Sequence, residues 1–351
     1  MKICVVGAGA IGGMLGARLA AAGEDVTLIA RGPHLAAIRK NGLKLIMEDG
    51  ETIVADQVAA TDDMHEPGPQ DLVILGLKAH QIAPVASDIR ALLGPETIVL
   101  TTQNGIPWWY FHGLGGEHEG KPVRSVDPDG EIGRHIESER VIGCIAYPAA
   151  EISEPGVIRH VEGMRFPVGE PDGSDSERVK AVSELLTRAG FKAPVLEDFR
   201  SELWLKLWGN LSFNPISALT HATLVDICQF PLSRQLASDM MTEAQAVAEK
   251  LGASFRVPLE KRIQGAEKVG RHKTSMLQDV EAGKGMEIDS MIGAVVELGR
   301  TTGTPTPAIN AVYACVSLLN QTLSTENVRI RAEPLDVPGN AARPPLRQVA
   351  G

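Results

Sequence analysis

The chain of 351 residues has few cysteines, no long apolar run and no excess of basic charge. Its cysteines, Cys4, Cys144, Cys228 and Cys315, are far apart and form no CxxC pair, so we expect buried free thiols rather than disulfides or a metal site. No run approaches the roughly 18 apolar residues that span a bilayer. The net charge of −10 disfavours nucleic acid and anionic membranes as partners, and no signal-peptide pattern is visible. We therefore expect a soluble, cytoplasmic protein.

A glycine-rich turn stands between a predicted strand and a predicted helix. Lys2 to Val6 is a short β-rich run, and Met14 to Ala22 is helix-like. Between them lies Gly7-Ala8-Gly9-Ala10-Ile11-Gly12-Gly13. In dinucleotide-binding units the first glycine permits the turn, the second lets the backbone approach the pyrophosphate, and the third packs the helix on the strand. The segment favours a nucleotide site over a glycine-rich turn without a ligand.

The end of the second predicted strand, Asp25 to Ala30, lacks the acidic residue that usually binds the ribose 2′-hydroxyl of NAD. Arg31 and Gly32 stand there instead. A guanidinium suits a 2′-phosphate, so the pattern favours NADP(H) over NAD(H). The alternative is a solvated loop arginine.

Further segments continue the alternation of strands and helices. They are the strand Asp71 to Leu75, the helix Ile82 to Leu93 and the strand Thr97 to Leu100. This alternation predicts a parallel sheet, in which ligands gather beyond the C-terminal ends of the strands. Lys78 there could hold cofactor oxygens, and Asn104 could reach the nicotinamide ribose or the substrate. The alternatives are a surface lysine and an asparagine that only serves its turn with Gly105.

Two later β-like segments, Val141 to Tyr147 and Val157 to Val168, are expected to extend the same sheet, with a turn at Glu154-Pro155-Gly156 between them. Ser176 to Arg188 is an amphipathic helical pattern, and helical patterns dominate after Val195. These later candidates include Leu232 to Leu251, Pro258 to Lys268 and Ile288 to Gly299.

The length and the 44% apolar composition suit two domains. We predict an α/β fold with an N-terminal Rossmann-type parallel-sheet domain over residues 1–195, which contains an insertion at about 106–140. An all-helical domain follows over residues 196–325. Residues 326–351 are rich in proline and have no periodic apolar face, so a loose tail is expected.

Lys206, Asn210 and Asn214 fall at steps of four within Leu203 to Leu219, so a helix places them on one stripe. Apolar residues surround the rest of this helix, which is typical of a buried helix. A buried ammonium and two buried amides need partners, so the stripe indicates either a site wall or a snorkelling lysine beside satisfied asparagines. Pro215 predicts a kink or the end of the helix.

Together these segments resemble the ketopantoate reductase (2-dehydropantoate 2-reductase) family. The matching motifs are GAGAIGG at 7–13, Arg31, LKAHQ at 77–81, QNG at 103–105, ELWLKLWGNLSFNP at 202–215, and SMLQD followed by MEID at 275–289. They occur in the family's order over most of residues 1–320.

The resemblance implies an NADPH-binding domain, an all-helical domain, and reduction of a 2-keto acid to a 2-hydroxy acid in the cleft between them. The most direct reaction is that of 2-dehydropantoate to pantoate, in pantothenate biosynthesis. The implied cofactor contacts are Gly7, Ala8, Gly9, Ala10, Ile11, Gly12, Arg31, Lys78, Asn104 and Glu287. The implied substrate contacts are Asn104, Lys206, Asn210, Asn214 and Ser275. Lys206 and Glu287 are the implied catalytic residues, with Lys206 as the proton donor.

The chemistry of the reaction supports these roles. Hydride transfer to a keto carbon leaves negative charge on the oxygen, which a nearby group must protonate or stabilise. Lys206 can do both, and a carboxylate such as Glu287 would hold its ammonium in place. Alternative roles remain for two residues: Ser275 as the N-cap of a helix over 276–282, and Glu287 as a first-turn glutamate.

The chain departs from the family pattern after Asn104, where Ile106 to Arg140 intervenes. This insertion begins with Pro107-Trp108-Trp109-Tyr110-Phe111, which could form a lid or an apolar wall for a larger substrate. The alternative is packing on its own domain or on a dimer partner. Leu224 also stands where the family commonly has a polar substrate contact. His112, Glu117, His118 and Glu119 suit a solvated loop better than a metal site, so no metal is expected.

Our leading hypothesis is therefore an NADPH-dependent 2-keto acid reductase that acts on 2-dehydropantoate. One alternative is a paralogous reductase or dehydrogenase for a bulkier 2-keto or hydroxy acid. The other is a non-catalytic dinucleotide-binding redox sensor. Proteins of this architecture often dimerise through their helical domains, so a homodimer is possible.

Overall fold

The computed structural model describes residues 1–333 and divides into two compact units, Met1–Arg200 and a second unit that begins at Ser201. The predicted boundary stood at Val195. Residues 326–333 contain no helix or strand, and the rest of the predicted tail, 334–351, lies outside the described residues.

A seven-stranded sheet in the order β11-β8-β7-β6-β1-β2-β5 forms the centre of the first unit. Its strands are β1 (Lys2–Val6), β2 (Asp25–Ile29), β5 (Ala59–Thr61), β6 (Gln70–Leu75), β7 (Leu93–Thr101), β8 (Val141–Cys144) and β11 (Val168–Gly169). All neighbours pair in parallel except β11 with β8. Val6 lies opposite Ile29 and Leu75, and Leu75 lies opposite Thr101. These four strands thus end at one edge of the sheet.

The helices of this unit are α1 (Ala10–Ala21), α2 (Gly32–Asn41), α3 (Ala86–Ile89), α4 (Glu131–His135) and α5 (Glu177–Arg188). The amphipathic prediction for α5 is confirmed, and the Ser176 hydroxyl caps this helix by accepting a hydrogen bond from Val179 N. The apolar run Ile3–Val6 is fully buried, as a central strand covered on both faces requires.

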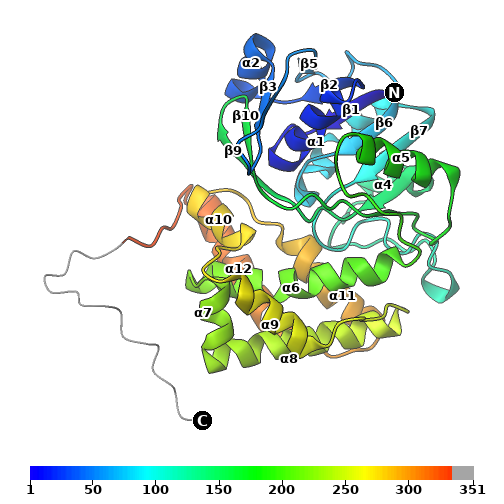
Figure 1. Ribbon diagram of the computed structural model, residues 1–351. Helices are drawn as coiled ribbons and strands as arrows, with labels where there is room; N and C mark the ends of the chain where they lie inside the picture. Colours follow the sequence, from blue (N-terminus) through cyan, green and yellow to red (C-terminus); the bar gives the residue numbers. More distant parts are fainter. Residues whose placement is uncertain (334–351) are drawn as a thin grey trace, which may run out of the picture. The chain divides into compact units, whose positions relative to one another are not determined.

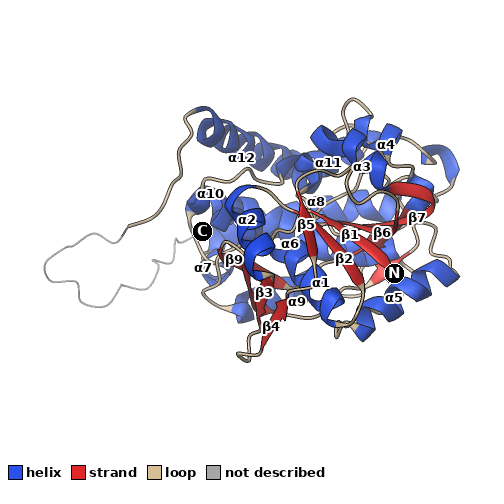
Figure 2. Ribbon diagram, turned by 90° about the horizontal axis from the view of Figure 1, so that it is seen from above, coloured by secondary structure: helices blue, strands red, loops and turns tan. Residues whose placement is uncertain are grey.

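A second, four-stranded sheet corrects one prediction. It has the order β4-β3-β10-β9, with β3 (Leu43–Ile46), β4 (Thr52–Ala55), β9 (Ala149–Glu154) and β10 (Val157–Glu162). The turn before β10 is as predicted, but β10 pairs with β3 on one side and with β9 on the other instead of extending the main sheet. Of the predicted later segments, only β8 and β11 extend the main sheet. Both views place the β9–β10 hairpin beside α2 and β3 (Figures 1 and 2).

The predicted helix Ile82 to Leu93 is wrong as a single element. The segment contains the 3-10 helices η2 (Ala83–Val85) and η3 (Arg90–Leu92), with α3 between them, and the 3-10 helix η1 (Ala79–Gln81) precedes it. Pro84 cannot donate a backbone hydrogen bond, and Val85 leaves helical geometry at φ −124° and ψ 8°. Two further 3-10 turns, η4 (Gly116–His118) and η5 (Ser138–Arg140), lie before β8.

The described part of the second unit contains helices and no strand, as predicted. The helices are α6 (Phe199–Thr220), which starts just before the unit boundary, α7 (Leu224–Gln229), α8 (Pro231–Lys250), α9 (Leu259–Val269), α10 (Ser275–Ala282), the π-helical η6 (Asp289–Gly293), α11 (Ala294–Thr301) and α12 (Pro307–Thr325). None of the helices in residues 1–333 is both long and apolar enough to span a membrane.

The structure decides several local predictions for this chain. Helix α6 continues through Pro215, so the alternative of a helix end there is wrong, and the kink stays a prediction. The N-cap of α10 is Thr274, whose hydroxyl accepts from Leu277 N, and Ser275 is the first helical residue. The expected helix from Ile288 begins with the π segment η6. Cys315 is exposed, whereas Cys4, Cys144 and Cys228 are buried free thiols as expected.

Candidate functional site

The glycine-rich segment forms the turn between β1 and α1. Gly7 has a φ of +97°, a left-handed conformation that favours glycine. A Cβ on Gly12 would lie 2.2 Å from Gly7 O, so glycine allows α1 to approach the end of β1. A Cβ on Gly9 would meet no atom within 4 Å. The backbone at Gly9 is therefore open, as a diphosphate at a helix N-terminus requires.

A cavity of about 510 Å³ lies beside this turn. The residues that line it include Gly7, Ala8 and Gly9 of the turn, Arg31 and His34 after β2, and Ile152 of β9. The turn and Arg31 follow strands that end at the same sheet edge. The cavity is therefore where a parallel sheet of this kind binds its ligand.

Arg31 is the one predicted specificity residue in this cavity. It follows β2 directly and stands at the N-cap of α2. Its side chain is exposed and makes no hydrogen bond or ion pair within residues 1–333. The guanidinium is thus available to an anionic group at the mouth of the cavity.

Lys78 and Asn104 follow β6 and β7 and so leave the same sheet edge, but neither lines the 510 Å³ cavity. Gln103, which the sequence analysis did not single out, connects the two loops. Its Nε2 donates to Leu75 O at 2.7 Å and to Leu77 O at 2.9 Å. This clamp fixes the loop that carries Lys78 beside the loop that carries Asn104.

Sequence reasoning also missed His34 and Ile152. No motif marks either residue, since His34 lies inside α2 and Ile152 belongs to β9. Ile152 reaches the cavity only because the β9–β10 hairpin pairs with β3, a long-range pairing that local patterns do not reveal. The His34 side chain contacts the glycine-rich turn directly, through a hydrogen bond between its Nε2 and Ala8 O at 2.8 Å.

The polar stripe of α6 has the burial pattern that the sequence predicts. From Glu202 to Ala218 every residue is buried except Lys206 and Asn210, which are half-buried. Asn214 completes the stripe and is 7% exposed. Because the rest of this stretch is buried, a ligand can reach α6 here along the stripe of Lys206, Asn210 and Asn214.

Asn214 and Ser275 are far apart in sequence, but the fold brings them together. Asn214 Nδ2 lies 3.4 Å from Ser275 Oγ and donates to it. Because Thr274 rather than Ser275 caps α10, the Ser275 hydroxyl is not committed to the helix N-terminus. Two predicted substrate contacts thus lie within one hydrogen bond of each other.

Glu287 is half-buried and lies two residues before η6, directly before its N-cap Ile288. Two hydrogen bonds to α12 hold the residues on either side of it, one through a backbone amide and one through a side chain. Met286 N donates to Asn320 Oδ1 at 3.2 Å, and Tyr313 OH donates to Asp289 Oδ1 at 2.8 Å. π-Helical segments are rare and frequently stand at functional sites, so this fixed segment supports Glu287 as a site residue.

The aromatic residues of the insertion pack inside the first unit. The side chains of Trp108, Trp109, Tyr110 and Phe111 are at least 94% buried. The Trp109 ring lies 5.9 Å from the Phe199 ring, and the guanidinium of Arg200 donates to Tyr110 O. The aromatic residues thus pack on the insertion's own domain, while Trp108 and Trp109 also line a cavity of about 350 Å³, so a role as a wall for the substrate stays a prediction.

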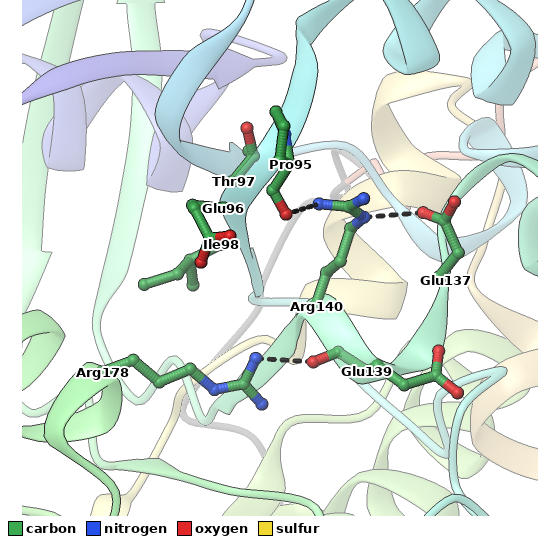
Figure 3. Close-up of a pocket in the computed structure, with 8 residues that line it drawn as sticks. All are labelled: Pro95, Glu96, Thr97, Ile98, Glu137, Glu139, Arg140 and Arg178. Carbon is green, nitrogen blue, oxygen red and sulfur yellow. Dashed lines mark hydrogen bonds and ion pairs between the residues drawn. The ribbon is translucent and has the colours of Figure 1, made fainter.

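Another cavity, of about 410 Å³, lies between the N-terminal half of β7 and the segment before β8 (Figure 3). Arg140 and Arg178 line it, but both guanidinium groups already donate hydrogen bonds to other residues of the protein. Arg140 Nε donates to Glu137, and Arg178 donates to Glu139 O and, through Nε and a terminal nitrogen, to Glu170. This cavity also lies at the N-terminal ends of the strands, whereas the glycine-rich turn follows a C-terminal end. We therefore do not assign a second anion site to it.

The histidines and glutamates of the insertion do not converge. Glu119 accepts from Gly113 N and Gly115 N, and His118 pairs with the exposed Glu117 at 3.4 Å. Over residues 1–333, no three His, Cys, Asp or Glu side chains come together as metal ligands would.

Comparison with known proteins identifies relatives over nearly the whole chain. Residues 3–173 match the family model described as ketopantoate reductase PanE/ApbA, and residues 198–320 match the model of its C-terminal part. A 2-dehydropantoate 2-reductase from Mesorhizobium japonicum is 55% identical over 91% of this chain and 98% of its own length. A 2-dehydropantoate 2-reductase from Pyrococcus horikoshii is 32% identical over 90% of this chain and 96% of its own length. A crystal structure from Ralstonia solanacearum, 40% identical, has a TM-score of 0.87 and covers 92% of this chain and 98% of its own.

Proposed function

The chain belongs to the ketopantoate reductase PanE/ApbA family, and we propose that it reduces 2-dehydropantoate to pantoate with NADPH, a step of pantothenate biosynthesis. The observation that carries the proposal is the strip formed by Lys206, Asn210 and Asn214 on the buried helix α6, with Ser275 bonded to it. These are the types of groups that a keto acid needs: a proton donor for its keto oxygen, and amides and a hydroxyl for its other oxygens.

The residues around the glycine-rich turn fit NADP(H). The open space at Gly9 and the N-terminus of α1 suit a diphosphate. Arg31 suits a 2′-phosphate because its guanidinium has no partner within residues 1–333. The apolar side of the cavity, which includes Ile29 and Ile152, suits an adenine ring. Lys78 and Asn104 would contact the cofactor closer to its nicotinamide end.

When bound, NADPH supplies the hydride that adds to the keto carbon. The ammonium of Lys206 stabilises the negative charge that develops on the keto oxygen and donates a proton to it, which yields the hydroxyl group. Asn210, Asn214 and Ser275 hold the substrate so that the keto oxygen meets the ammonium. Glu287 would orient the lysine and would contact the nicotinamide ribose when the cofactor is bound.

Steady-state kinetics with a panel of 2-keto acids tests the function. We expect rapid NADPH oxidation with 2-dehydropantoate, stoichiometric formation of pantoate, and much lower kcat/KM with phenyl-substituted keto acids. Activity confined to the bulkier acids would reject 2-dehydropantoate as the substrate in favour of the paralogous alternative, which the aromatic insertion and Leu224 suggest.

The non-catalytic sensor makes a different prediction. It requires that NADPH binds tightly while no keto acid accelerates its oxidation. It also requires that Lys206→Ala changes the stability of the protein and nothing else. Loss of turnover in Lys206→Ala with intact NADPH binding would reject the sensor.

We further propose a homodimer. Helix α12 contains no charged residue, and its exposed face carries Ala311, Ala314 and Leu318, the last with 64% of its surface exposed. Light scattering coupled to size-exclusion chromatography should give twice the 37.4 kDa chain mass, and Leu318→Glu should give the monomer. A monomeric wild type would reject the dimer.

A further inference from the structure

His34 connects two parts of the first unit that are distant in sequence. Its Nε2 lies 2.8 Å from Ala8 O in the glycine-rich turn, and its Nδ1 lies 3.0 Å from Gly156 N at the tip of the β9–β10 hairpin. The hairpin tip also packs on α2, since a Cβ on Gly156 would lie 2.9 Å from the Cβ of Ala37. One side chain thus holds the turn, α2 and the hairpin together.

The two contacts define which form of the imidazole is present. Gly156 N–H can only donate, so Nδ1 must be an unprotonated acceptor. The hydrogen therefore resides on Nε2, which donates to Ala8 O. Burial lowers the pKa of His34, which favours this neutral form.

The bond to Ala8 O also orients the next backbone amide. The Ala8–Gly9 peptide is planar and trans, so the Gly9 N–H points away from the direction in which Ala8 O points. Gly9 stands at the N-cap of α1, where the first amides have no partner within the helix. By holding Ala8 O on one side, His34 directs the Gly9 amide toward the other side.

We propose that His34 is a positioning residue for the cofactor diphosphate: it fixes the Ala8–Gly9 peptide with one ring nitrogen and docks the β9–β10 hairpin, which carries Ile152, with the other. The inference rests on the proposed binding of NADP(H) to this cavity. It assigns to His34 the diphosphate, whereas Arg31 is assigned the 2′-phosphate, so the two residues should respond differently to different ligands.

Calorimetric titration with three ligands separates these roles. NADPH contains both the diphosphate and the 2′-phosphate, NADH lacks the 2′-phosphate, and adenosine 2′-monophosphate lacks the diphosphate. His34→Ala should raise the Kd of NADPH and of NADH about tenfold. It should raise that of adenosine 2′-monophosphate by clearly less, because this ligand loses only the support of the Ile152 contact to its adenine ring. Arg31→Ala should weaken NADPH and adenosine 2′-monophosphate and spare NADH. Equal weakening of all three ligands by His34→Ala would overturn the proposal, because it would indicate general disruption of the cavity.

Two amide variants keep the test decisive if His34→Ala does not fold. Glutamine places its amide nitrogen about as far from the backbone as Nε2, so His34→Gln retains a donor for Ala8 O. Asparagine is shorter and retains only an acceptor for Gly156 N. We expect near-normal NADPH affinity in His34→Gln and about tenfold weaker binding in His34→Asn. Equal affinities of the two would overturn the proposal.

His135→Ala is the matched control, since His135 is a partly exposed histidine of the same unit that does not line the cavity. Its NADPH affinity should equal that of the wild type. A wild-type protein that binds neither NADPH nor NADH would reject the proposed function and the role of His34 with it. Normal wild-type binding with an unaffected His34→Ala would reject only the role of His34.

Discussion

In the first unit the candidate ligand contacts are mainly backbone groups of the turn Gly7 to Gly12, with Arg31 beside them. In the second unit they are side chains on α6, at Lys206, Asn210 and Asn214. A backbone site depends on the absence of side chains, because glycines leave room for a ligand. A side-chain site depends on the few polar side chains that an otherwise apolar helix carries. The two kinds of site should therefore fail in different ways when they are mutated.

The largest effect is expected at Lys206, because it is proposed to act on the reacting atoms. Lys206→Ala should lower kcat about a hundredfold or more, as expected for loss of a general acid, while the Kd of NADPH stays within about twofold. Lys261→Ala, at an exposed lysine of α9, is the control and should behave as wild type. A kcat that survives Lys206→Ala would leave the α6 strip without its proposed role.

A pair of glycine variants tests the backbone site. Gly9→Ala places its Cβ where no protein atom lies within 4 Å, so stability should change by less than about 1 kcal/mol. NADPH binding should weaken about tenfold or more, since the methyl group occupies the space assigned to the diphosphate.

Gly12→Ala should show the opposite result, with a large loss of stability and a smaller direct effect on NADPH binding. Its Cβ would lie 2.2 Å from Gly7 O, so the turn must shift, at a cost of about 1–3 kcal/mol in unfolding free energy. Chemical denaturation and NADPH titration of both variants make the comparison. If Gly9→Ala binds NADPH normally, the open space there is not the diphosphate site.

Sequence and structure agree where the pattern is local. The strand, glycine turn and helix at the N-terminus follow from contiguous residues, and the buried helix α6 follows from its periodicity. Disagreement arises where distant segments decide the outcome. The β-like pattern predicts a strand at β10 but none at β9, and the place of β10 beside β3 depends on a partner more than a hundred residues away. The role of His34 is invisible for the same reason, since both of its contacts are non-local.

The helix boundaries show a second limit. Thr274 and Ser275 are equally good cap residues by type, and only backbone geometry decides that Thr274 caps α10. The π segment η6 is likewise invisible to an analysis of 3.6-residue periodicity. These details decide whether the Ser275 hydroxyl and Glu287 are available to a ligand. The residues of the candidate site could therefore be predicted from the sequence, but the hydrogen bonds and helix ends that position them could not.

Arg31 is the one side chain of the first site with a predicted specificity role. Arg31→Ala should raise the KM of NADPH about tenfold and leave that of NADH nearly unchanged, because it removes a charge-assisted contact to the 2′-phosphate. Initial rates with each cofactor at saturating keto acid measure the ratio. Equal losses with both cofactors would contradict the assignment of the 2′-phosphate to Arg31.

The second site has supports of its own, in α12. Tyr313→Phe removes the hydrogen bond to Asp289 that holds the segment next to Glu287. We expect kcat to fall about threefold, with the Kd of NADPH unchanged, because one hydrogen bond contributes about 1 kcal/mol or less. Ser324→Ala, at an exposed residue of the same helix, is the control. An unaltered kcat would show that Glu287 does not depend on this bond.

The smallest expected effect is the dependence of stability on the protonation of His34. Burial lowers the pKa of this histidine below its ordinary value of about 6.5, so the unfolded chain binds a proton more readily than the folded one. The contribution of His34 is therefore complete above about pH 6.5 and is lost as the pH falls through the lowered pKa. Arg31 and His80 line the same cavity and Glu154 adjoins the hairpin tip, so their own charges must be subtracted.

His34→Gln makes this subtraction, because it keeps those three groups and cannot be protonated. Between pH 7.5 and pH 5.5 the wild type should lose more thermal stability than His34→Gln, by on the order of 1–2 °C in Tm. An NMR titration of the imidazole C–H signal should place the pKa of His34 below 6.5. A normal or raised pKa would contradict a hydrogen bond from Gly156 N to Nδ1 in solution. His34 would then contact the glycine-rich turn but not the hairpin.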